Sequence, residues 1–152
     1  ASFKFGYICT MDELIQFIDL PDYSPKDKDL ADWLRSCALV YKVQIEQLQY
    51  SFVSEEKLLS LNKTYLDHDT DTDIVTFSYA QVPFVEAEIY ISTSRLEENA
   101  KKFNQTLENE LLRLLSHGFL HSIDYLDGDE DQKKIMREQE ERCIQMFHVK
   151  HS

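Results

Sequence analysis

The stretch TLENELLRLLSHGFLHSIDYLD, residues 106–127, carries the strongest pattern in the chain. Thr106 is followed by leucines and a phenylalanine at helical spacing, so the segment predicts one long helix. His117 and His121 lie four residues apart within it, and a helix places both imidazoles on one face, within reach of a single ion. The sequence therefore predicts a metal site near the end of this helix.

A catalytic zinc site takes three protein ligands and leaves a fourth position for water. Asp127, six residues beyond His121, is our candidate for the third ligand, because Gly128 helps the chain to turn back. Asp124 and Asp129 remain alternatives at this point. Two imidazoles and one carboxylate favour zinc, although nickel, manganese and ferrous iron suit the same donors. We expect one divalent ion per chain.

The HxxxH spacing is weakly specific by itself, because histidines four apart often only satisfy buried hydrogen bonds on a helix. The residue after His117 is Gly118, where HExxH peptidases carry the glutamate that serves as the general base. A zinc peptidase of that class is therefore not expected.

The bulk properties predict one domain over residues 1–152, without disorder or low-complexity segments. Every apolar run is shorter than a membrane span, and the first residues lack the pattern of a secretory signal, so no membrane association is expected. Cys9, Cys37 and Cys143 are odd in number and have no metal-binding spacing. We expect a protein of the reducing cytoplasm.

Acidic residues outnumber basic residues by 28 to 16, which gives a formal net charge of −12. Phosphate binding depends on Lys and Arg displacing counterions, so this balance argues against a protein that holds DNA or RNA through its overall charge. An RNA contact then needs a local basic patch. Lys133, Lys134 and Arg137 after the ligand loop are candidates, and an ordinary solvated helix face is the alternative.

Periodicity predicts the remaining elements. Helical spacing predicts helices over residues 28–41, from Ser54 to about Leu66, over 93–103 and over 131–147. Alternation and β-branched residues predict strands over residues 43–53, 74–79 and, after Pro83, up to 92, and a weaker alternation predicts a first strand over 2–9.

Three blocks of the sequence resemble the YbeY family of single-metal bacterial endoribonucleases. The family motif HGxLHxxGYDH is similar to residues 117–127, with matches at His117, Gly118, Leu120, His121 and Tyr125. A second motif, LNxxYRxxDxxTDVLSF, resembles residues 61–77, with matches at Leu61, Asn62, Tyr65, Asp69, Thr72, Asp73 and Phe77. A third, GDIxIS, resembles AEIYIS at residues 87–92.

The chain departs from the first motif at three positions. Asp124, Leu126 and Asp127 stand where Gly, Asp and the third His are usual. Asp127 thus falls at the position of the third ligand and is itself a suitable ligand. Asp124 tolerates the left-handed conformation that a helix-ending Gly adopts.

The resemblance implies an α+β fold, in which about five helices pack around a small mixed sheet and the metal lies in a cleft at the end of the long central helix. It implies a metal-dependent endoribonuclease that cuts RNA with a metal-activated water. Its implied role is maturation of small-subunit ribosomal RNA and ribosome quality control in the cytoplasm. RNA and the small ribosomal subunit are the implied partners, and Zn²⁺ the implied cofactor.

Leu66 stands where the family usually has an Arg, a residue well suited to holding phosphate through two parallel hydrogen bonds. Lys63 and Arg137 are our candidates for replacing it as phosphate contacts. The residues alone do not distinguish phosphorus from carbon as the electrophile. A hydrolase of a peptide or small molecule, or a non-catalytic metal-binding factor on the ribosome, are therefore the alternative functions.

Overall fold

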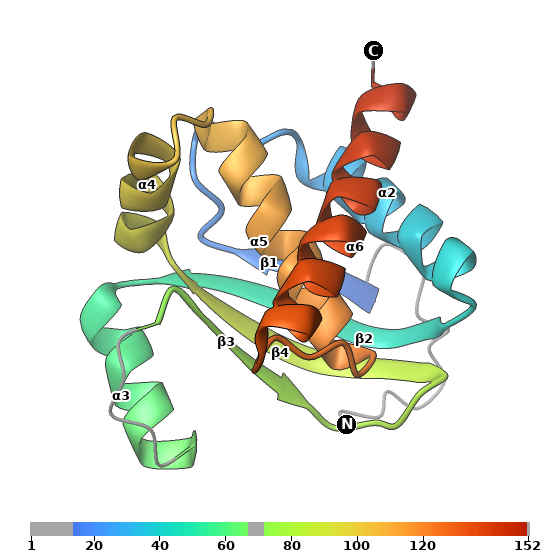
Figure 1. Cartoon of the computed structure of the whole chain (residues 1–152), viewed down its shortest axis with the longest axis horizontal. Helices are drawn as coiled ribbons and strands as arrows, with labels where there is room; N and C mark the ends of the chain where they lie inside the picture. Colours follow the sequence, from blue (N-terminus) through green and yellow to red (C-terminus); the bar gives the residue numbers. More distant parts are fainter. Residues whose placement is uncertain (1–13, 67–71, 152) are drawn as a thin grey trace, which may run out of the picture.

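A four-stranded mixed sheet runs through the computed structural model, which describes residues 14–66 and 72–151 (Figure 1). The strand order is β1-β2-β4-β3. β2 is parallel to both β1 and β4, whereas β3 is antiparallel to β4. The strands are β1 (Ile15–Ile18), β2 (Gln44–Val53), β3 (Ile74–Ser78) and β4 (Phe84–Ser92).

Five helices accompany the sheet in the described ranges, namely α2 (Asp27–Tyr41), α3 (Glu55–Leu66), α4 (Thr93–Lys102), α5 (Leu107–Ser122) and α6 (Glu130–Lys150). α5 packs against α4, α6 and the sheet, while α3 lies at the end of the sheet where β2 ends and β3 begins (Figure 1). The expected α+β fold is confirmed. None of the helices in these ranges is long and apolar enough to cross a bilayer.

β1 was not expected from the sequence. The strand predicted over residues 2–9 lies outside the described residues, and the observed first strand is the four-residue run IQFI. So short a segment shows no clear period, and it pairs in parallel with β2, with Ile15 opposite Leu48. Only this pairing with a strand that lies far along the chain identifies it.

Gly118 allows α5 to lie close against the sheet. A Cβ atom at this position would lie 2.8 Å from Cγ2 of Ile89 on β4 and 3.2 Å from Cδ1 of Ile74 on β3. Real Cβ atoms do not approach other atoms to 2.8 Å, so a larger residue would push the helix away. The absence of a side chain therefore sets the position of the helical turn between His117 and His121.

Two buried hydrogen bonds fix α5 and α6 relative to the rest of the core. The Tyr50 hydroxyl on β2 donates to the carbonyl oxygen of Leu115 on α5, at 2.7 Å. The Trp33 indole on α2 donates to the carbonyl oxygen of Cys143 on α6, at 2.7 Å. Tyr50 and Trp33 are fully buried, so these bonds lie in the core. They hold the two helices that carry the candidate site.

Candidate metal site

His117, His121 and Asp127 lie together at the C-terminal end of α5. Oδ2 of Asp127 is 3.3 Å from Nε2 of His117 and 3.3 Å from Nε2 of His121. One ligand atom from each residue lies within 4.8 Å of the other two. The imidazole planes cross at 84°, and the two short distances show that both Nε2 atoms face the carboxylate. Two imidazole nitrogens and a carboxylate oxygen arranged in this way could hold a divalent ion.

The loop after α5 turns Asp127 back toward the helix. Asp124 has a left-handed φ of 74°, as its place in the motif suggested, and the amide of Tyr125 donates to the carbonyl oxygen of Leu120. Asp124 is exposed, and Asp129 caps α6 by accepting a hydrogen bond from the amide of Gln132, at 2.8 Å. Of the three aspartates considered, only Asp127 contacts the histidines, and its ligand role stays a prediction.

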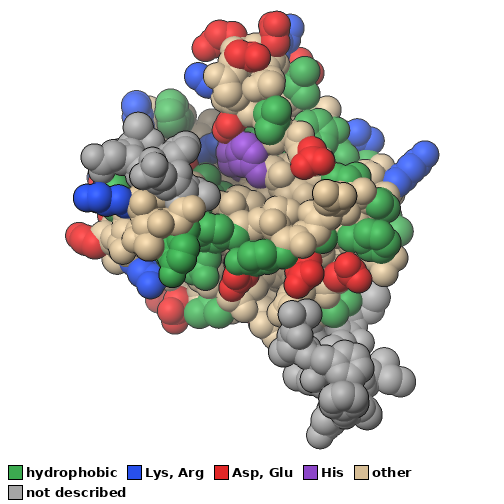
Figure 2. All heavy atoms as spheres, turned by 90° about the horizontal axis from the view of Figure 1, so that it is seen from below, with side chains coloured by type: hydrophobic (Ala, Val, Ile, Leu, Met, Phe, Trp, Pro, Cys, Tyr) green, Lys and Arg blue, Asp and Glu red, His purple; other side chains and the backbone are tan. Residues whose placement is uncertain are grey.

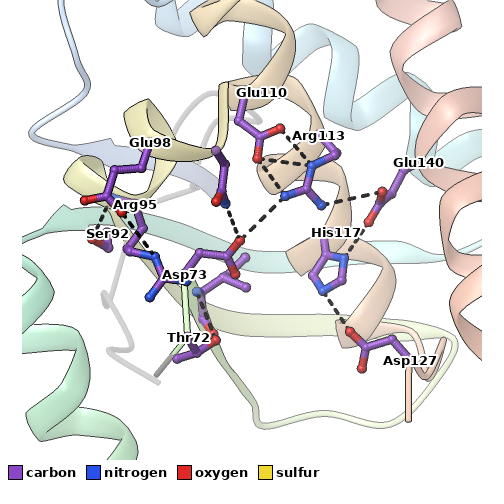
Figure 3. Close-up of polar contacts among 12 residues, drawn as sticks. Thr72, Asp73, Ser92, Arg95, Glu98, Glu110, Arg113, His117, Asp127 and Glu140 are labelled. Atoms are coloured by element: carbon purple, nitrogen blue, oxygen red, sulfur yellow. Dashed lines mark hydrogen bonds and ion pairs between the residues drawn. The ribbon is translucent and has the colours of Figure 1, made fainter. Parts of the chain in front are cut away.

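Each histidine is oriented by a partner at its other ring nitrogen. Nδ1 of His121 lies 2.9 Å from the carbonyl oxygen of Tyr125. Nδ1 of His117 lies 2.5 Å from Oε2 of Glu140 on α6 (Figure 3). Because both partners are acceptors, Nδ1 carries the proton in each neutral ring and Nε2 is left to bind an ion.

Sequence reasoning missed Glu140, although a signal for it existed. The buried face of α6 carries Met136, Cys143, Ile144 and Phe147, and Glu140 belongs to the same face with an exposed fraction of 4%. Acidic residues are almost never buried unless they are paired. An acidic residue at an apolar position of an amphipathic helix therefore indicates a buried partner, here His117.

A network of charged side chains continues from Glu140 (Figure 3). Nη1 of Arg113 lies 3.7 Å from Oε1 of Glu140, and Arg113 also donates to both carboxylate oxygens of Glu110. Nη2 of Arg113 is 3.6 Å from Oδ2 of Asp73, which in turn accepts a hydrogen bond from Asn99. The network joins α4, α5, α6 and the residue before β3 around the candidate site.

The electrostatics of the site favour a cation. Burial lowers the pKa of His117, but its hydrogen bonds to Asp127 and Glu140 outweigh burial and raise the pKa to about 9. Burial, together with the charge of His117, lowers the pKa of His121. The hydrogen bond from His117 lowers the pKa of Asp127 to about 2. In the metal-free protein the proton on Nε2 of the His117 cation, which faces Asp127, thus occupies the position that a metal ion would take over.

The candidate phosphate contacts Lys63 and Arg137 are exposed residues of α3 and α6, respectively. Within the described residues neither makes a hydrogen bond or ion pair with the three ligand candidates. Lys133 pairs with Glu130, at 3.7 Å. A role for Lys63 and Arg137 in binding phosphate stays a prediction.

The candidate site is open to solvent. The side chains of His117, His121 and Asp127 are 12%, 25% and 42% exposed. Histidine surface is visible in a hollow on the face seen from below (Figure 2). A small mixed sheet, a central helix with two histidines and a facing carboxylate define an α+β protein with a candidate single-metal centre.

Comparisons with known proteins agree with this description. The family model described as "Endoribonuclease YbeY" matches residues 22–148. The endoribonuclease YbeY of Flavobacterium johnsoniae is 37% identical over 123 residues, which cover 81% of this chain and 88% of that protein. That of Cytophaga hutchinsonii is 38% identical over 119 residues, covering 78% and 83%.

A solution structure of a Thermotoga maritima protein superimposes with a TM-score of 0.60 and covers 90% of both chains, at 26% identity. The chain belongs to the YbeY endoribonuclease family, and the resemblance inferred from the three motifs is confirmed. It is therefore a hydrolase of the nuclease class.

Proposed function

We propose that this chain is a metal-dependent endoribonuclease in which His117, His121 and Asp127 bind one divalent ion, with Zn²⁺ the best match. The observation that carries the proposal is the convergence of two Nε2 atoms and one carboxylate oxygen at the end of α5, in a member of the YbeY family. Although the family usually has a third histidine at position 127, the aspartate here can also serve as a ligand, because its carboxylate contacts both imidazoles.

The donor set fits a catalytic rather than a structural site. Three protein donors leave a coordination position for water or substrate, whereas structural zinc sites are closed by four. The half-exposed side chain of Asp127 leaves a path to solvent. A divalent ion bound there supplies Lewis acidity and an activated water. The ion would be held by His117, His121 and Asp127. Glu140 orients the imidazole of His117, and the Tyr125 carbonyl group orients that of His121.

The proposed substrate is RNA, in particular ribosomal RNA of the small subunit, and the proposed partner is that subunit in the cytoplasm. Family membership supports the RNA substrate, since the matched relatives are named endoribonucleases. Small-subunit ribosomal RNA follows from the resemblance in the motifs. With a net charge of −12, the chain must use a local contact for the RNA backbone. Lys63 and Arg137 are the proposed contacts.

The test is cleavage of a labelled precursor of small-subunit ribosomal RNA by the purified protein. We expect cleavage that stops on treatment with a chelator and returns on addition of Zn²⁺, with transfer RNA cut more slowly and casein left intact. His117→Ala, purified in parallel, controls for contaminating ribonucleases.

Three other results would contradict the proposal in distinguishable ways. Cleavage that persists with chelator and in His117→Ala would mean that the activity does not come from this site. Chelator-sensitive digestion of casein would indicate a peptidase. Bound metal without cleavage of either substrate would indicate a metal-binding factor without catalysis.

A further inference from the structure

The two candidate histidine ligands differ in what holds the nitrogen that faces away from the ion. His121 uses the neutral carbonyl group of Tyr125, in the loop that follows its own helix. His117 uses the carboxylate of Glu140, which comes from the neighbouring helix α6, 23 residues further along the chain. His117 is therefore oriented by tertiary packing and by a negative charge, whereas His121 is oriented locally.

Glu140 is itself held in place from its other side. One carboxylate oxygen faces Nδ1 of His117 at 2.5 Å, and the other faces Nη1 of Arg113 at 3.7 Å. Arg113 is fixed by Glu110, with hydrogen bonds of 2.9 Å from Nε and 2.6 Å from Nη2. The Glu140 side chain is 5% exposed, and a carboxylate buried to that extent is strongly destabilising unless it is paired. Both pairings therefore resist rotation of the carboxylate.

We propose that Glu140 is the positioning residue of the metal site, and that Arg113 holds Glu140 in the orientation that aligns His117. The inference rests on the proposed metal site. By accepting the Nδ1 proton, Glu140 fixes the tautomer in which Nε2 of His117 is the free donor. Its negative charge also makes the imidazole a stronger ligand than one that donates to a neutral acceptor.

This arrangement couples metal binding to the packing of α5 against α6. Asp127 lies in the loop just before α6, and Glu140 lies within α6, so one helix controls both the third ligand and the orientation of the first. A metal ion bound by His117 and Asp127 would link the end of α5 to the loop before α6, and His117 would link it further to Glu140 within α6. Displacement of α6 would then lower the metal affinity even with all three ligands intact.

Glu140→Gln removes the negative charge of the side chain and keeps its shape. The carboxylate of Glu140 offers acceptor oxygens to two donors, Nδ1 of His117 and Nη1 of Arg113. Glutamine has the same shape but one acceptor oxygen, and its NH₂ group must face one of these two donors. One of the two contacts is therefore lost, and the negative charge with it.

The experiment measures the zinc dissociation constant of E140Q by competition with a chromophoric chelator. We expect binding about 10- to 100-fold weaker than in the parent, the range typical for loss of an outer-shell partner of a metal ligand. E141Q is the matched control, because Glu141 is the next residue of α6, carries the same charge and is exposed. Its zinc affinity should equal that of the parent.

A second measurement needs no variant and covers the case in which E140Q does not fold. In a long-range proton–nitrogen NMR spectrum of the zinc-loaded parent, His117 should carry its proton on Nδ1 and show metal coordination at Nε2. Equal zinc affinities of folded E140Q and the parent, or a His117 ring without a proton on Nδ1, would overturn the proposal regardless of any result with RNA. A parent that binds no zinc would overturn the metal site itself, and this inference with it.

Discussion

The candidate metal ligands (the ligand side) and the proposed phosphate contacts (the phosphate side) differ in how firmly the fold holds them. On the ligand side, both imidazoles are largely buried and each is fixed by a partner at Nδ1. On the phosphate side, Lys63 and Arg137 project from the exposed surfaces of two different helices. Arg113, which pairs with Glu140 behind His117, is bound by carboxylates.

This difference shows which part of the reaction is preorganised. Side chains that are already paired and buried lose little freedom when an ion arrives, so the fold itself favours cation binding. Exposed, flexible cations gain little from a single phosphate contact and are screened by salt. We therefore expect large effects from changes on the ligand side and small effects from changes on the phosphate side.

The largest effect should follow from removal of a helix histidine. His117→Ala and His121→Ala should each retain less than about 0.1 metal ion per chain after dialysis, because two remaining ligands hold an ion poorly. Because the metal is lost, RNA cleavage by both variants should fall to the background rate. Elemental analysis of the purified proteins measures the first effect, and cleavage of labelled RNA measures the second.

His148→Ala is the matched control, since His148 is an exposed histidine near the end of α6 whose contacts are with Asn109 and Phe147. It should keep the full metal content. Full metal content in both helix variants would show that the ion is bound elsewhere, and that His117 and His121 are not a preorganised metal site.

The stability of the metal-free protein should depend on pH through His117. Its pKa in the folded state is about 9, against about 6.5 for an unfolded chain, because contacts with Asp127 and Glu140 outweigh burial. The stabilisation is therefore complete below about pH 6.5 and is lost as the pH rises through about 9. We expect a loss on the order of 3 kcal/mol in the free energy of unfolding, since each pKa unit corresponds to about 1.4 kcal/mol.

Urea unfolding of the chelator-treated parent and of His117→Gln, from pH 6 to pH 10, measures this effect. The difference between parent and variant should shrink over this range, because Gln does not titrate. A constant difference would mean that His117 is not protonated between the two carboxylates, which removes the electrostatic part of the argument for a cation site.

A smaller effect is expected from Asp127→His, which restores the third histidine usual in the family. The variant should bind one metal ion with an affinity within about tenfold of the parent, since imidazole and carboxylate are both good ligands for zinc. Asp127→Ala should bind the ion much more weakly. Isothermal titration with Zn²⁺ compares the three proteins, and equal affinity of parent and Asp127→Ala would exclude Asp127 as a ligand.

The sequence predicted the ligand side of the site better than the structure around it. The four-residue spacing of His117 and His121 needs only a helix to bring the imidazoles together, so local periodicity was sufficient. Asp127 was predicted from its distance to His121 and from its place in a motif, and the structure adds that Asp124 and Asp129 have other roles. Glu140 was missed although its place on the apolar face of α6 signals a buried partner, because the sequence does not tell which residue of another helix that partner is.

The same distinction explains the strands. β2, β3 and β4 were predicted because each has enough residues to show alternation or a β-rich composition. β1 has four residues and is defined by parallel pairing with β2. Contacts between segments far apart in the chain are what sequence patterns do not report.

The smallest effects should come from the phosphate side, and they decide whether that side works as proposed. Leu66, the last residue of α3, occupies the place of the usual family Arg. Leu66→Arg should raise the rate of RNA cleavage about tenfold at fixed salt, because one charge-assisted contact to phosphate contributes roughly 1.5 kcal/mol. The zinc content should not change, since the substitution leaves all three ligands in place.

Lys63→Ala or Arg137→Ala should lower cleavage about two- to fivefold, the effect of one exposed and screened contact. For whichever residue touches phosphate, the slope of log affinity against log salt concentration should also become shallower by about one. Lys150→Ala serves as the control, because Lys150 is an exposed basic residue at the opposite, C-terminal end of α6. A lower rate with an unchanged salt slope would point to a fold defect rather than to a lost phosphate contact. If both variants cut RNA at the parent rate with the parent's salt slope, residues other than Lys63 and Arg137 bind the RNA backbone. The comparison of the preorganised ligand side with a weakly held phosphate side would then not apply to these two residues.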